Sequence, residues 1–93
     1  MTSLDTVKRY LRIMGDEEDA LLAPLILSAE QYLLNAGVTE LGEDATDGQR
    51  AQYEITVALY VNALYNGVDP KDTALQAAMT ANILQMKSYG GVT

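Results

Sequence analysis

The sequence contains no cysteine and no histidine, and tyrosine is its only aromatic residue type. Without cysteine, disulfides and thiolate metal sites are excluded. Without histidine, the chain lacks the usual general base and the commonest transition-metal ligand. Neither a Ser-His-Asp nor a Cys-His catalytic set can be built, and no phosphate-binding loop or dinucleotide fingerprint is present. The sequence therefore predicts a protein that is not an enzyme and holds no cofactor or metal.

Positive charge is also scarce, because six bases stand against thirteen acids and give a net charge of −7. Domains that bind nucleic acid by neutralising phosphates need a basic patch, so this balance disfavours that function. Three of the bases, Lys8, Arg9 and Arg12, lie in residues 1–14, which sum to +2 and leave −9 for the rest. A basic end and an acidic body can attract each other between copies of a small chain.

Long apolar runs are few, and the most prominent, Ile55–Tyr65, has eleven residues without charge. A bilayer span needs roughly 20 apolar residues, so this segment predicts the central helix of a soluble fold. Its apolar residues occur on nearly all sides, and 93 residues make a single domain with a small core. We therefore expect a second subunit to cover one face of this helix. The N-terminus lacks the basic and apolar regions of a signal peptide, so an intracellular product is expected.

The whole chain, residues 1–93, is predicted to be all-α, a small four-helix domain with no sheet, because no strand pattern of period two is present. The expected helices cover residues 4–13, 17–36, 48–66 and 70–88. Their expected N-caps are Ser3, Asp16, Asp47 and Asp69. Glycine is expected to end the first three, at Gly15, Gly37 and Gly67.

Helical spacing also predicts which side chains form the core. On the first helix they are Leu4, Val7, Leu11 and Met14, and on the fourth they are Leu75, Ala78, Met79, Ile83 and Met86. Pro24 predicts a kink or a broken first turn in the second helix. Asn62 and Asn82 fall on apolar faces, so they are expected to bond each other or to mark an interface.

The segment Glu43–Glu54 has part of the spacing of a calcium-binding loop, with glycine at its sixth position and glutamate at its twelfth. Its third position is Ala45, which cannot ligate, and its first is glutamate where aspartate is expected. We therefore favour Asp47 as a helix cap over a calcium site.

Five segments carry a family pattern. They are L-D-T-V-K-R-Y-L-R-I at 4–13, G-D-E-E-D-A-L-L at 15–22, A-E-Q-Y at 29–32, N-A-G-V at 35–38 and I-L-Q-M-K-S-Y-G at 83–90. In this order they resemble the tailed-phage head–tail connector (adaptor) proteins.

The resemblance implies a structural protein that forms a ring under the portal of the DNA-filled capsid and extends the DNA channel. It implies a role in joining head to tail, in head completion and in DNA packaging and retention. The implied partners are other copies of the chain, the portal protein and a tail or stopper protein, with no membrane and no sequence-specific nucleic acid. The implied location is the head–tail junction of the virion, after synthesis in the host cytoplasm.

Twelve residues are candidate contacts to a neighbouring subunit or the portal: bases of the first helix, apolar residues of the second and third helices, and two residues near the C-terminus. They are Lys8, Arg9, Arg12, Leu27, Leu34, Tyr53, Val57, Tyr60, Val61, Leu64, Lys87 and Tyr89. Two alternatives remain open. A small acidic regulator of a host or phage protein would need acids aligned on one rigid surface, and a DNA-binding regulator would depend on three bases of a chain with charge −7.

Overall fold

The computed structural model describes residues 4–38 and 45–87, and these form four helices and no strand. The helices are α1 (Leu4–Leu11), α2 (Asp19–Asn35), α3 (Asp47–Tyr65) and α4 (Thr73–Lys87). The prediction of an all-α, four-helix domain is confirmed. Among the described residues, no helix is both long and apolar enough to cross a membrane.

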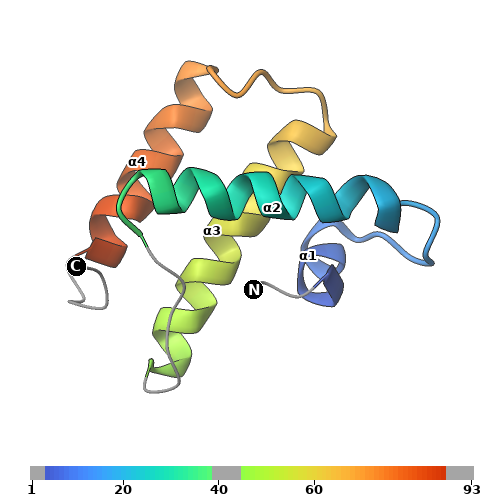
Figure 1. Cartoon of the computed structure of the whole chain (residues 1–93), viewed down its shortest axis with the longest axis horizontal. Coiled ribbons are helices and arrows are strands. Elements are labelled where there is room, and N and C mark those ends of the chain that lie inside the picture. The colour runs from blue at the N-terminus through green and yellow to red at the C-terminus, as the bar shows by residue number, and fades with distance from the viewer. Residues whose placement is uncertain (1–3, 39–44, 88–93) are drawn as a thin grey trace.

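The central element of the fold is α3. It packs against all three other helices, and α1 also contacts α2. Figure 1 shows α2 crossing α3, with α1 and α4 at opposite sides of the molecule. The sides of α3 that carry Tyr53, Val57, Tyr60 and Val61 are therefore buried within one chain. The chain itself therefore covers this face, whereas Ile55, on another side of α3, is 45% exposed. The expectation that a second subunit covers one face of this helix stays a prediction for the Ile55 side.

The core joins side chains from every helix. Its fully buried members include Val7 from α1, Leu22 and Leu33 from α2, Val61 from α3 and Met79 from α4. Full burial of such a side chain stabilises the fold by about 1.5–3 kcal/mol. The predicted core positions of α4 are confirmed, except that Ala78 is only partly buried.

Two helix starts differ from the sequence-based expectation. At α3 the N-cap is Thr46, whose hydroxyl accepts from the Gln49 backbone N–H at 3.1 Å while the Gln49 side chain accepts from the Thr46 backbone N–H at 2.9 Å. This reciprocal pair satisfies two amides, so Asp47 becomes the first helical residue and not the cap. At α4 the Asp72 carboxylate accepts from the Leu75 N–H at 3.0 Å.

The other three expected caps also fail or lie outside the described residues. Asp69 accepts from the Lys71 N–H at 2.8 Å, so it forms a turn before α4 and does not begin the helix. Asp16 does not cap α2, which begins at Asp19 with no side-chain cap. Ser3 lies outside the described residues.

The end of α1 is unusual, because Arg12 adopts a positive φ of 58°. The Ile13 N–H donates to the Lys8 carbonyl at 2.9 Å and the Arg12 N–H to the Arg9 carbonyl at 3.2 Å. These hydrogen bonds end the helix with Arg12 in the left-handed conformation, a position that glycine usually occupies. The helix therefore stops before Gly15, and Met14 does not reach the core. Instead Ile13 packs against the core, and Met14 is 93% exposed.

Gly37 and Gly67 have φ of 93° and 81° and follow α2 and α3 as expected. Of the two effects expected from Pro24, a broken first turn is absent, because the helix is continuous through Pro24 and the Leu22 N–H donates to the Glu18 carbonyl at 2.9 Å. The kink stays a prediction.

Polar side chains connect the helices at the edge of the core. Asn82 accepts a hydrogen bond from Gln52 at 2.9 Å, which joins α4 to α3. Asn62 accepts from Asn66 at 2.9 Å within the C-terminal part of α3. Asn62 and Asn82 therefore have separate partners, and the expectation that they bond each other is wrong. The alternative, that they mark an interface, stays a prediction.

Candidate subunit interface

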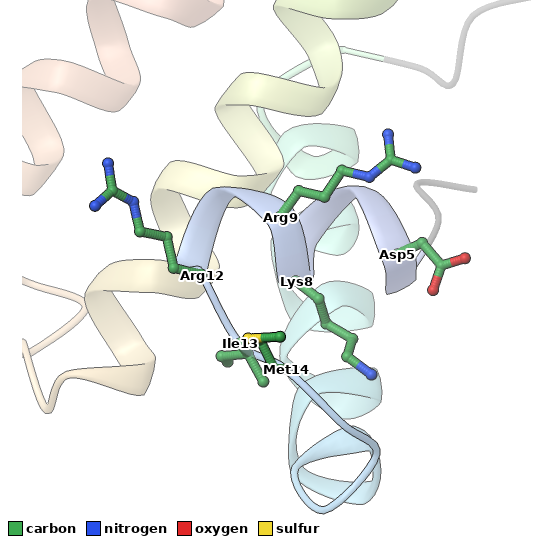
Figure 2. Close-up of a pocket in the computed structure, with 6 residues that line it drawn as sticks. All are labelled: Asp5, Lys8, Arg9, Arg12, Ile13 and Met14. Atoms are coloured by element: carbon green, nitrogen blue, oxygen red, sulfur yellow. The ribbon is translucent and has the colours of Figure 1, made fainter.

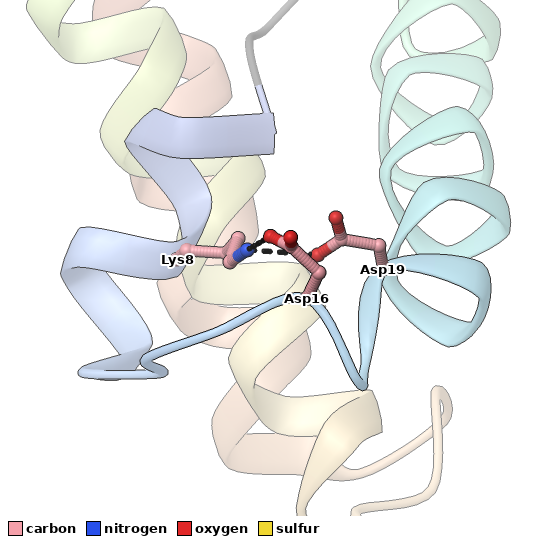
Figure 3. Close-up of polar contacts among 3 residues, drawn as sticks. All are labelled: Lys8, Asp16 and Asp19. Atoms are coloured by element: carbon pink, nitrogen blue, oxygen red, sulfur yellow. Dashed lines mark hydrogen bonds and ion pairs between the residues drawn. The ribbon is translucent and has the colours of Figure 1, made fainter.

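The three bases of the N-terminal segment are not equivalent. The Lys8 ammonium donates to the Asp19 carboxylate at 2.8 Å and to the Asp16 carboxylate at 3.3 Å (Figure 3). The hydrogen bond to Asp19 is the main cause that raises the Lys8 pKa above its ordinary value. The Lys8 charge is thus satisfied inside the chain, between α1 and the start of α2, and is not presented to a partner.

Arg9 and Arg12 are exposed and form no ion pair with any other residue in the described ranges. Figure 2 shows their guanidinium groups pointing away from the helices in different directions. Together with Asp5, Lys8, Ile13 and Met14 they line an open hollow of about 400 Å³. This end of the molecule therefore offers two available positive charges beside an exposed methionine.

A second hollow lies beside α2, where Leu27 and Leu34 are 56% and 52% exposed. We call it the α2 groove. It has a volume of about 250 Å³ and is lined by Leu27, Glu30, Gln31, Leu34, Val38 and Tyr53. Small-molecule sites usually have about 300–1,000 Å³, so the α2 groove fits a single side chain better than a metabolite.

Tyr53 connects the α2 groove to the core. Burial, with a further contribution from the charge of Glu30, raises the Tyr53 pKa to about 12. The phenol stays neutral at physiological pH, so Glu30 is the charged residue in the lining of the α2 groove.

The other candidate residues divide into two groups. Val57, Tyr60 and Val61 lie in the core of the chain, and the Tyr60 ring packs against Tyr32 with centroids 5.0 Å apart. Leu64 is partly buried against that core. Nothing is assigned to the Lys87 side chain or to Tyr89, which lie outside the described part of the chain.

Sequence reasoning missed Met14 as a surface residue. Helical periodicity placed it in line with Leu4, Val7 and Leu11, and Gly15 suggested that the helix continued to that point. No sequence pattern indicated that Arg12 would adopt the left-handed conformation, which glycine usually occupies.

Within residues 4–38 and 45–87, no group of three acidic side chains is arranged to hold a metal ion. The segment considered for calcium is helical from Asp47 onward, so these residues cannot wrap around an ion as a loop does. Glu43 lies outside the described residues.

The comparisons with known proteins give one result. The sequence profile of a phage gp6-like head-tail connector protein family matches residues 1–86. No curated protein and no solved structure matches the chain.

Proposed function

The chain belongs to the phage gp6-like head-tail connector protein family, and from this premise we propose that its copies form a ring under the portal of the DNA-filled capsid. As a member of this family the chain is a phage structural protein and not an enzyme. The proposed ring extends the DNA channel and provides the surface on which a tail or stopper protein docks. It acts in head completion and DNA retention, at the head–tail junction, after synthesis in the host cytoplasm.

The observation that carries this proposal is the exposure of large apolar side chains on a fold whose core is already complete. Leu27 and Leu34 lie seven residues apart on α2 and are about half exposed, while the face of α3 that carries Val57 and Val61 is buried within the chain. Exposed apolar side chains that lie close together commonly mark contact sites. They are therefore available for a neighbouring subunit or the portal.

The charge of the chain fits a channel role. A net charge of −7 per copy, repeated around a ring, repels DNA phosphates, so the genome passes the wall without binding to it. Sequence-specific contact with DNA is not part of this proposal.

The test is to combine the purified chain with the portal protein of the same phage and to image the particles by electron microscopy. We expect an additional ring on the portal. The double variant Leu27→Asp/Leu34→Asp should lose the ring and stay folded, whereas Thr80→Asp, at an exposed position of α4, is the matched surface control. A wild-type chain that never joins the portal would overturn the proposal and favour the small acidic regulator.

A further inference from the structure

Two surface features of complementary shape lie at opposite ends of α2. Met14 precedes its N-terminal end in the chain and is 93% exposed, and the α2 groove is lined by residues of its C-terminal half. Because Met14 is so exposed in the structure, it does not occupy the α2 groove of its own chain, and that groove is available to a different copy.

Met14 is the most exposed large apolar side chain described in the chain, at 93%. The backbone places it there, because the positive φ of Arg12 ends α1 before the helix can turn Met14 inward. An unbranched methionine adapts its shape to irregular apolar surfaces. A groove of about 250 Å³ lined by two leucines and a tyrosine is a fitting site for one such side chain.

Charge complements the shape. Arg9 and Arg12 line the same hollow as Met14 and have no ion-pair partner in the described residues, whereas Glu30 lies in the lining of the groove. Residues 15–93 carry a net charge of −9, so the guanidinium groups of one copy meet a predominantly negative body in another.

We propose that Met14 of one copy inserts into the α2 groove of a second copy, with Arg9 and Arg12 of the first copy facing the negatively charged body of the second. This inference rests on the proposed ring and specifies how its subunits join. The two surfaces are made of different residues, so each copy uses one surface on each neighbour. Such a head-to-tail contact continues from copy to copy and can close into a ring, whereas a contact between identical surfaces stops at a dimer.

Cysteine cross-linking tests the contact directly, because the natural chain has no cysteine. We would prepare Met14→Cys and Leu34→Cys as separate full-length variants, assemble them on portal and oxidise them. The mixture should give a covalent dimer, while each variant alone should not. The double variant Met14→Cys/Leu34→Cys should give a ladder of covalent multimers. Leu84→Cys, at an exposed position of α4, replaces Leu34→Cys in the control mixture and should not cross-link to Met14→Cys.

A second measurement uses Met14→Asp. Since the side chain is exposed, urea unfolding should be unchanged, while self-association should weaken by about tenfold or more, the scale of a central interface residue. Rings that form on portal without the Met14–Leu34 cross-link, or a dominant Met14–Met14 cross-link, would overturn the contact and leave the connector function intact. Absence of any ring would instead overturn the proposed function and the contact together.

Discussion

Lys8 of α1 and Asp19, the first residue of α2, form a hydrogen-bonded ion pair of 2.8 Å, and the same ammonium reaches Asp16 at 3.3 Å. Acidic side chains at the start of α2 suit the positive end of its helix dipole. The structure adds a second cause, because two of these acids hold the neighbouring helix through one lysine.

This pair predicts an order of effects on stability. Asp19→Asn should lower the urea midpoint more than Asp16→Asn, because the Asp19 contact is shorter and the Asp16 side chain is almost fully exposed. The raised Lys8 pKa means that the stabilisation is fully present below about pH 10.5 and is lost as the pH rises through the folded-state value. Equal midpoints for both variants near neutral pH would contradict the assignment.

Replacing Arg12 should separate stability from assembly. Arg12→Gly is expected to raise the free energy of unfolding by about 0.5–1 kcal/mol, because glycine adopts positive φ without strain. It should at the same time weaken self-association, since one charge is removed from the proposed contact. Arg9→Gly is the matched control: Arg9 lies within α1, so glycine there should destabilise by about 1 kcal/mol. Chemical unfolding and sedimentation measure the two properties, and destabilisation by Arg12→Gly would refute the prediction.

The candidate interface set should divide according to burial. Val61→Asp places a charge in the core and should unfold the chain, because an unpaired buried charge is costly. Leu27→Asp, at a half-exposed site, should change the free energy of unfolding by no more than about 0.5 kcal/mol. Circular dichroism during thermal unfolding distinguishes the outcomes. Two folded variants, or two unfolded ones, would contradict the structure.

Alkaline pH should destabilise the fold through buried tyrosines. The Tyr53 pKa is raised to about 12 and burial also raises that of Tyr60, so the unfolded chain loses these protons first. Stability is therefore full below about pH 10 and declines toward pH 12, by about 1–2 kcal/mol for Tyr53. Tyr53→Phe should reduce this decline in urea titrations at several pH values. An unchanged alkaline loss would show that other groups cause it.

The sequence predicted the helices because their signals are local. Glycine after α2 and α3, and the apolar spacing of α4, act within a few residues of the chain. The helix starts were predicted less well. Asp16, Asp47 and Asp69 are all residue types that cap helices, but whether one of them does so depends on which residue nearby makes the hydrogen bond to the first backbone N–H groups. At α3 that neighbour is Thr46, since Gln49 completes the reciprocal pair.

The sequence could not predict which of the candidate interface residues are exposed. Leu27 and Val61 are both apolar residues on helices with more than one apolar face, yet one is exposed and the other is in the core. Which face is covered depends on how three helices wrap around α3. Lys8 likewise was grouped with Arg9 and Arg12 by charge, and only the approach of α2 to α1 separates them.

The composition of α4 has a consequence for how the two ends of the molecule respond to the solvent. From Thr73 to Met86 this helix contains no ionisable side chain, whereas the end that carries Arg9 and Arg12 exposes charged groups of both signs. Screening shortens from about 10 Å at 0.1 M salt to about 3 Å at 1 M, so binding through the arginine end must weaken across that range. Contacts through α4 have no charge to screen, and sulfate strengthens apolar burial. The type and amount of salt therefore identify which end of the subunit a given association uses.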